Sequence, residues 1–214
     1  MPASLILALA LVVQAPATVR NTWEKTYATS SAESFAATFE EPSRALFRYR
    51  QAIAGLMQIQ PGMTVAEVGA GSGYLARFLV QKVGAGGHVL ANELEPRMVE
   101  YMKVRAAKEG LTNFTAVRGT ATSTGFQPGS VDAVAVVYAF SFFDHPADML
   151  RSLSDSLKPN GLLLIVDSPR EGLTVSSPGM DADEVLDLTA AAGFTRLGES
   201  GVVPGHYSLI FRKK

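Results

Sequence analysis

The sequence predicts an α/β fold in which a mostly parallel sheet is covered by helices on both faces. From residue 64 onward, short apolar runs typical of buried strands alternate with stretches of helical periodicity. A glycine-rich turn joins the first of these strands to the first of these helices. The chain has 214 residues, of which 47% are hydrophobic and 18% charged, so it is long enough to bury one full core.

The elements follow one another in a regular order. Residues 18–42 combine a loop with a short helix, and a longer helix is expected from Pro42-Ser43 to Pro61. The expected strands cover residues 64–68, 88–93, 114–118, 131–138, 162–166, 194–198 and 206–212. The expected helices cover residues 74–83, 96–109, 146–157 and a segment from Asp181 to Ala192. Proline at the start and glycine just past the end mark several of these helices.

The first 17 residues read as a segment separate from the fold. Residues 3–13 form an unbroken apolar run, which is too short for a bilayer span of about 20 residues. Ala15-Pro16-Ala17 supplies a small-x-small cleavage pattern, so we expect a signal peptide and export to the periplasm; without a signal peptide, the expected location is the cytoplasm. No Lys or Arg precedes the run, and a misassigned start or an apolar helix packed on the domain is the alternative. The expected segments are 1–17, an N-terminal helical segment over 18–60, and the main domain over 61–214.

Composition excludes several classes of function. The formal net charge is -1, which gives no electrostatic reason to expect nucleic-acid binding. The absence of cysteine excludes disulfides, zinc–thiolate sites and cysteine nucleophiles. The three histidines, His88, His145 and His206, lie on separate segments, so no metal site is predicted. The sequence leaves the oligomeric state open.

The glycine turn carries the strongest functional signal. Glu67 and Val68 lead into Gly69-Ala70-Gly71-Ser72-Gly73-Tyr74. A dinucleotide fingerprint needs a third glycine where Tyr74 stands, and the spacing here is G-x-G-x-G after an acidic residue. This pattern resembles the first motif of class I S-adenosylmethionine-dependent methyltransferases. The resemblance extends over residues 43–214, because Ser130-Val131-Asp132, Lys158-Pro159-Asn160-Gly161 and Ala192-Gly193-Phe194 are also similar to family landmarks.

The resemblance implies a Rossmann-like seven-stranded sheet of order 3-2-1-4-5-7-6 that binds S-adenosylmethionine. It places the methionine part of the cofactor along Gly69, Ala70, Gly71, Gly73 and Tyr74. It implies that Glu67 contacts the amino end of the methionine part and that Glu93 binds the ribose hydroxyls. It also implies that Leu94 packs on the adenine ring and that Thr120 and Ala121 contact the adenine amine. The family usually has Asp or Glu where this chain has Thr120. The glycines could instead form only a tight turn, Glu67 could cap that turn, and Glu95 is the alternative ribose ligand.

The methyl acceptor should lie over residues 138–146. This loop lacks the Asn-Pro-Pro-aromatic motif of the family's amide and adenine N-methylating branches, so we expect a small-molecule acceptor. His145, beside Asp144, is the candidate general base, and Tyr138 the candidate that orients the acceptor. Alternatively, Asp144 or His145 only caps the following helix. Two further sets of residues have two interpretations each. One set either lines a lid over the acceptor or packs an N-terminal helix on the core, and it consists of Trp23, Tyr27, Phe35, Phe39 and Phe47. The other set either binds an anionic acceptor or forms a solvated helix face, and it consists of Arg44, Arg48 and Arg50.

The sequence therefore predicts a methyltransferase that acts on a small molecule by in-line transfer. Two other classes stay open. One is a protein of the same fold that binds S-adenosylmethionine or S-adenosylhomocysteine without turnover, which the altered Thr120 favours. The other is a nicotinamide-dependent oxidoreductase, against which the missing third glycine argues.

Overall fold

Seven strands form one mixed sheet in the order β3-β2-β1-β4-β5-β7-β6, which confirms the predicted order. The computed structural model describes residues 29–170 and 179–214. The strands are β1 (Thr64–Val68), β2 (His88–Glu93), β3 (Phe114–Arg118), β4 (Val131–Val137), β5 (Leu157–Asp167), β6 (Phe194–Ser200) and β7 (Tyr207–Lys213). β1 to β5 pair in parallel, and β7 lies antiparallel between β5 and β6.

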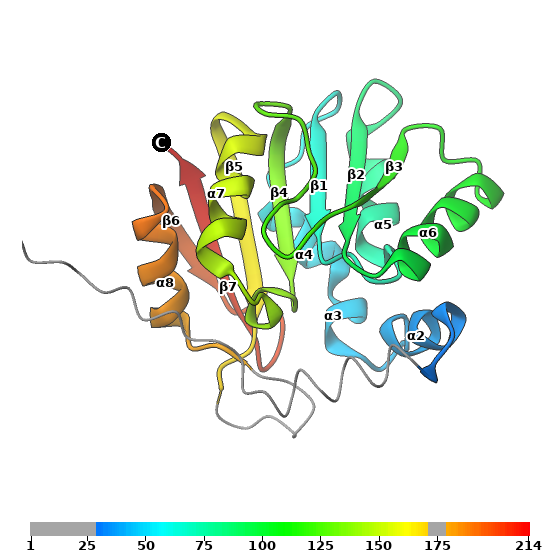
Figure 1. The fold of residues 1–214 in the computed structure, drawn as a ribbon, viewed down its shortest axis with the longest axis horizontal. Helices are drawn as coiled ribbons and strands as arrows, with labels where there is room; N and C mark the ends of the chain where they lie inside the picture. Colours follow the sequence, from blue (N-terminus) through cyan, green and yellow to red (C-terminus); the bar gives the residue numbers. More distant parts are fainter. Residues whose placement is uncertain (1–28, 171–178) are drawn as a thin grey trace, which may run out of the picture.

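Helices cover both faces of the sheet because the central strands are apolar on both faces (Figure 1). The helices are α2 (Ala32–Phe39), α3 (Ala45–Arg48), α4 (Arg50–Leu56), α5 (Tyr74–Val83), α6 (Pro96–Lys108), the short 3₁₀ helix η1 (Phe140–Phe142), α7 (Pro146–Ser156) and α8 (Ala182–Ala191). In β4, Ala133 and Ala135 pack with α4, α5 and α6 in one core, whereas Val134 and Val136 pack with α7 and α8 in the other. The two-residue period of a strand thus builds two cores from one sequence run.

Local signals place most helix ends. Glu95 is the N-cap of α6 and accepts a hydrogen bond from the Arg97 N–H, with Pro96 in the first turn. Asp181 and Glu184 form the predicted capping box of α8. Most boundaries lie within two residues of the prediction, and two elements differ by more. The helix expected from residue 42 is divided into α3 and α4 at Tyr49, where ψ is 13°, and β5 already begins at Leu157, because Leu157 pairs with Val131 ahead of a register shift.

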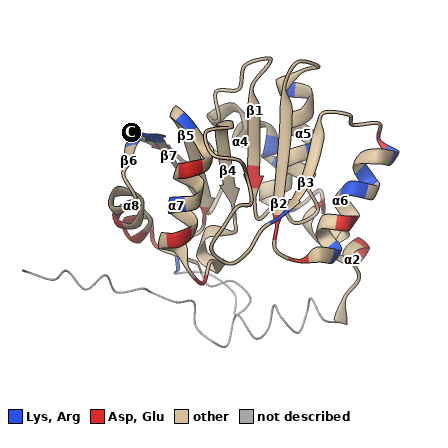
Figure 2. Cartoon of the chain, turned by 45° about the horizontal axis from the view of Figure 1, so that its top comes forward, with Lys and Arg blue, Asp and Glu red and all other residues tan. Residues whose placement is uncertain are grey.

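α2 and α3 lie at the lower edge of the sheet in Figure 1, where the parallel strands end. An ion-pair network fixes α2 there. Glu40, its C-cap residue, bonds Arg77 of α5 at 3.0 Å and Arg105 of α6 at 2.8 Å, and both arginines also pair with Glu109. Figure 2 shows the mixture of basic and acidic residues on α6 beside acidic residues of α2. The N-terminal segment is therefore anchored to the main domain over its described part.

Some predictions concern residues outside the described ranges. The expected signal peptide (1–17) and the aromatics Trp23 and Tyr27 lie there, so export stays a prediction. Within residues 29–170 and 179–214, no helix is both long and apolar enough to cross a membrane.

Candidate functional site

Three glycines in the left-handed backbone region shape the loop between β1 and α5. Gly69, Gly71 and Gly73 have φ angles of 73°, 54° and 71°, which residues with a Cβ atom rarely adopt. Space is limited as well. A Cβ on Gly71 would lie 2.9 Å from Cε2 of Phe39, and one on Gly69 would collide with the Cβ of Ala139. The loop thus brings bare backbone against both α2 and the loop after β4.

Glu93, the last residue of β2, is a buried carboxylate that holds this loop. Its Oε2 accepts a hydrogen bond from the Gly71 N–H at 3.0 Å, and its Oε1 accepts from the Leu94 and Glu95 N–H groups at 2.8 and 3.2 Å. Burial raises the pKa of Glu93, and the three backbone donors oppose that shift. A carboxylate offers about four acceptor positions. Two ribose hydroxyls that donate to Glu93 would therefore have to replace at least one of these three hydrogen bonds. Of the three, only the bond from the Gly71 N–H comes from the glycine loop.

Glu67 lies inside the fold behind the loop. It is 1% exposed, and its Oε2 accepts a hydrogen bond from the Ala76 N–H in the first turn of α5 at 2.8 Å. Burial raises the pKa of Glu67 to about 8, although the Ala76 bond lowers it, and the nearby charge of Glu93 raises it further. Glu67 thus bonds the first turn of α5, and its role at the amino end of the cofactor stays a prediction. Tyr74, which opens α5, is also buried.

The residues predicted to contact the adenine lie in the loops after β2 and β3. Leu94 is 56% exposed. Thr120 is exposed and its Oγ1 accepts a hydrogen bond from the Thr122 N–H at 3.3 Å, while Ala121 is half-buried. The alternative ligand Glu95 is already engaged, because it caps α6 and pairs with Nε of Arg97 at 2.8 Å.

The loop after β4 is fixed by a second buried acid. Tyr138 has a φ of 53° and donates its N–H to the Val166 carbonyl at 2.7 Å. Asp167, at the end of β5, accepts hydrogen bonds from the N–H and Oγ of Ser141 at 3.0 and 3.2 Å. Burial raises the pKa of Asp167 to about 6, and the Ser141 bonds act against that shift. Asp167, which sequence reasoning passed over, therefore positions the loop of Tyr138.

His145 lies apart from this cluster. It is exposed and occupies the N-cap position of α7 without a side-chain capping bond. In the part of the chain that the structure describes, no hydrogen bond, ion pair or ring contact joins it to Tyr138 or to the glycine loop. A base role for His145 stays a prediction to which these contacts add nothing.

Arg44 joins the glycine loop to Tyr138. Its guanidinium carbon lies 5.6 Å from the ring centre of Phe39 and 5.8 Å from those of Tyr74 and Tyr138. The structure separates the three arginines that the sequence grouped. Arg48 is exposed, and Arg50 stacks 4.2 Å from the Phe47 ring and donates to the Phe47 carbonyl. Among the predicted aromatics, Phe35 is buried and Phe39 reaches Gly71.

His206 completes the cluster, and sequence reasoning missed it as a site residue. It lies just before β7, and its ring centre is 5.6 Å from that of Tyr138. The sequence offered one signal, a Pro204-Gly205 turn that brings a histidine to the start of a strand. In the described ranges, no group of three or more His, Asp or Glu is arranged to hold a metal ion.

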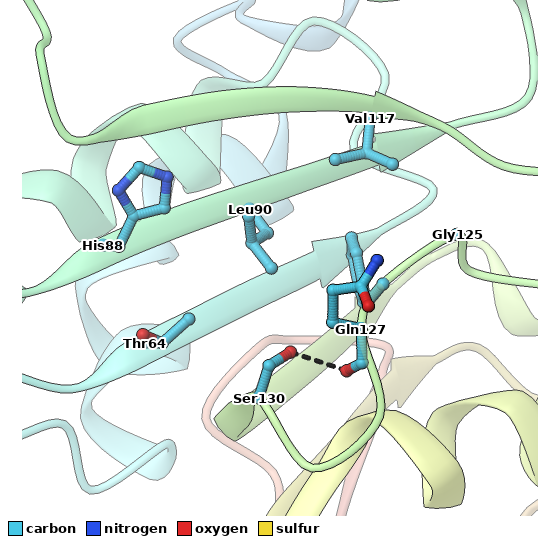
Figure 3. Close-up of a pocket in the computed structure, with 8 residues that line it drawn as sticks. Thr64, His88, Leu90, Val117, Gly125, Gln127 and Ser130 are labelled. Carbon is cyan, nitrogen blue, oxygen red and sulfur yellow. Dashed lines mark hydrogen bonds between the residues drawn. The ribbon is translucent and has the colours of Figure 1, made fainter.

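A separate cavity of about 320 Å³ lies away from this cluster (Figure 3). Thr64 and His88 in its lining are the first residues of β1 and β2, so it sits toward the opposite ends of the strands. Its lining residues are Thr64, His88, Leu90, Val117, Gly125, Phe126, Gln127 and Ser130. The connection of residues 119–130 crosses the sheet there without a helix.

The family described as "Methyltransferase domain" matches residues 65–161, which run from β1 into the start of β5 and include the glycine loop and Glu93. Over these residues the chain has the sequence of a class I S-adenosylmethionine-dependent methyltransferase domain. The family's methyl donor is S-adenosylmethionine.

Three proteins illustrate how similar the chain is to known sequences and structures. A ubiquinone/menaquinone biosynthesis C-methyltransferase from Legionella pneumophila is 29% identical over 113 residues, 52% of this chain and 45% of the relative. A methyltransferase of Aquifex aeolicus has a structure with a TM-score of 0.77 at 23% identity, covering 87% of this chain and 100% of that one. The [4+2]-cyclase SpnF has a TM-score of 0.68 at 17% identity, covering 78% and 80%. The chain spans about half the length of the curated relatives it matches, and the structural likenesses show the fold.

Proposed function

We propose that this protein transfers the methyl group of S-adenosylmethionine to a small-molecule acceptor. One observation supports the proposal above others: the G-x-G-x-G loop after β1 is hydrogen-bonded to a buried carboxylate at the end of β2, at the edge where the parallel strands end. Ligands of open α/β sheets bind at that edge. The Legionella relative's name, a C-methyltransferase of quinone biosynthesis, agrees with a small-molecule acceptor.

The residues at this edge fit the cofactor. The loop has no Cβ atoms at Gly69 and Gly71, Glu93 supplies a carboxylate for the ribose hydroxyls, and Leu94 supplies an exposed apolar side chain for the adenine ring. Ala70, Gly73 and Tyr74 continue the loop along the methionine part. Thr120 and Ala121 offer only a hydroxyl and backbone to the adenine amine, which is weaker than the carboxylate common in the family.

The chain's own residues then have a limited task. The cofactor supplies an already activated methyl group, so the protein has to hold the acceptor about 3–3.5 Å from it and in line with it. It also has to exclude water. Phe39, Arg44 and Tyr138 are the candidates for this task, because Phe39 lies against Gly71 of the glycine loop and Arg44 contacts the rings of Phe39 and Tyr138.

Calorimetry with S-adenosylmethionine and S-adenosylhomocysteine tests the cofactor. We expect binding that weakens about tenfold or more in Glu93→Gln, because a hydrogen bond to a charged group contributes roughly 1.5–3 kcal/mol. The matched control is Glu95→Gln, a neighbouring acid engaged in capping α6, which should bind as the unchanged protein does. Equal affinities of the two variants would contradict the assignment of Glu93.

Methyl transfer itself is tested by S-adenosylhomocysteine formation with a panel of small phenols, hydroquinones, amines and thiols. A second candidate, cofactor binding without turnover, is favoured by Thr120, which stands in the usual acid position and is exposed. Binding without product from any acceptor would favour that candidate. The family match favours methyl transfer over the nicotinamide-dependent alternative.

A further inference from the structure

His206 stands where two distant segments meet at the proposed acceptor side. Tyr138 comes from the loop after β4, and His206 from the turn that leads into β7, with 5.6 Å between their ring centres. Tyr138 in turn lies 5.8 Å from the Arg44 guanidinium, which also contacts Phe39 and Tyr74 at the glycine loop. The imidazole of His206 is thus connected, through Tyr138 and then Arg44, to the residues packed at the glycine loop.

The hydrogen bonds of His206 define its tautomer. Its Nδ1 lies 2.9 Å from the Pro204 carbonyl oxygen. A carbonyl oxygen only accepts hydrogen bonds, so Nδ1 must carry the proton and donate. In a neutral ring, Nε2 then has its lone pair free, and no residue of the described ranges donates to it. The backbone therefore presets the ring for accepting a proton at Nε2.

The surroundings keep this ring neutral. Burial lowers the pKa of His206, the Pro204 bond acts in the opposite direction, and the positive charge of Arg44 lowers the pKa further. Arg44 at the start of α3 is the charged group that faces it, and Tyr138 is the titratable group in ring contact. No described carboxylate pairs with the ring. A neutral imidazole at pH 7 is the form that a general base requires.

We propose that Nε2 of His206 is the general base that removes a proton from the methyl acceptor held beside Tyr138. This inference rests on the proposed methyltransferase function. In the step, the acceptor's nucleophilic atom forms a bond to the methyl carbon while the carbon–sulfur bond breaks and its electron pair stays on sulfur. The acceptor's proton passes to Nε2 and then to solvent. The products are the methylated acceptor and S-adenosylhomocysteine.

The proposal narrows the acceptor class. A base is needed only where the nucleophile carries a proton that must leave, as in phenols, hydroquinones, thiols and acidic carbon centres. Thioethers, tertiary amines and ionised carboxylates need none. We therefore expect acceptors with a protic nucleophile.

Imidazole ¹⁵N NMR on the full chain tests the assignment without an acceptor. The chain has three histidines, so single His→Gln variants assign each ring. We expect His206 to be the Nδ1–H tautomer, to titrate below the ordinary histidine value of 6.5, and to shift when S-adenosylhomocysteine is added. His88, bonded to Thr115 at the far ends of the strands, is the control ring that should not shift. An Nε2–H tautomer, or a His206 ring unaffected by bound S-adenosylhomocysteine, would overturn the proposal.

Kinetics with the protic acceptors of the panel supply a second test. His206→Gln keeps an N–H donor for Pro204 but has no base, so kcat should fall about 100-fold or more, and the acidic limb of the kcat–pH profile should disappear. Cofactor affinity should stay within twofold, which separates loss of the base from loss of the cofactor site. If His145→Gln loses the acidic limb and His206→Gln does not, the base is His145. If the unchanged chain does not bind the cofactor, the proposed function itself fails.

Discussion

The two halves of the site are built in different ways. On the β1–β3 side, the candidate cofactor residues lie in one short loop and at the ends of adjacent strands, and backbone N–H groups make most of the contacts. On the β4–β7 side, the cluster consists of side chains from distant segments, in which the Tyr138 ring contacts both the Arg44 guanidinium and the His206 ring. The first half is specified by a motif, whereas the second is specified only by the fold.

This difference separates the part of the site that carries the family motif from the part that carries none. The glycine turn and the acid at the end of β2 belong to the pattern that resembles the methyltransferase family. The arginine among three rings, with a histidine beside one of them, belongs to no motif of the sequence. Substitutions on the β1–β3 side should therefore change stability and cofactor binding together. Those on the β4–β7 side should change acceptor chemistry and local pKa values.

Gly69→Ala should have the largest effect on the β1–β3 side. The added Cβ would occupy a left-handed conformation and collide with Ala139. Strain of about 1–2 kcal/mol and overpacking of about 1–3 kcal/mol should together lower the free energy of unfolding by about 2–5 kcal/mol. Urea denaturation measures this loss in the free energy of unfolding. The control is Gly55→Ala in α4, where an added Cβ meets nothing within 4 Å and should be neutral or slightly stabilising. Equal stabilities of the two variants would show that Gly69 is not required by the loop.

Each half contains a buried acid, and both should make stability decrease as the pH rises. Burial raises the pKa of Glu67 from 4.5 to about 8 and that of Asp167 from 3.8 to about 6. A group that binds its proton more tightly when folded contributes stability that is complete below its unfolded pKa and is lost as the pH rises through the folded pKa. The stability contributed by Asp167 should be lost between about pH 4 and 6, and that contributed by Glu67 between pH 4.5 and about 8. Each contributes a slope of at most about 1.4 kcal/mol per pH unit.

Thermal unfolding in a pH series checks this sign. Glu67→Gln should flatten the upper part of the curve, above pH 6, and Asp167→Asn the lower part. A stability that increases between pH 5 and 8 in the unchanged chain, and does so equally in both variants, would show that neither acid holds its proton in the folded state.

Glu40→Ala should have a smaller effect, since it removes one partner of a partly buried network. Glu40 is 16% exposed and pairs with both Arg77 and Arg105. We expect a loss of about 1–2 kcal/mol in the free energy of unfolding. The exposed pair Arg196–Glu199 is the matched control, and Glu199→Ala should cost less than about 1 kcal/mol. If Glu40→Ala changes stability no more than the control does, the network does not anchor α2.

The same division explains how far the sequence could predict the structure. The capping box of α8 and the glycine loop depend on local patterns, so they could be read from the chain. The strand order depends on long-range pairing, and it was predicted from the family resemblance. The division of the first long helix at Tyr49 has no glycine or proline to mark it. The glycine turn could be recognised from the sequence, but the bond of Glu93 to that loop depends on tertiary placement.

The acceptor side could not be assembled in the same way. His145 was chosen because it follows Asp144 in the chain, yet neighbours in sequence on a loop need not share a site. His206 lies far along the chain, and it reaches Tyr138 only because β7 inserts antiparallel beside β5. Arg44 looked like one of three surface arginines until the fold placed Phe39, Tyr74 and Tyr138 around it.

The smallest predicted effect tests the coupling within that cluster. Arg44→Gln removes the cation that lowers the pKa of His206, so that pKa should rise toward its ordinary value while burial still holds it below 6.5. The change in pKa should be small, because Arg44 is itself only half-buried and solvent screens its charge. The ¹⁵N titration of His206 measures it, with Arg48→Gln, an exposed arginine on the same segment, as the control. If the two variants give the same His206 pKa, Arg44 does not act on the ring electrostatically, and its contacts with the three aromatic rings are packing alone.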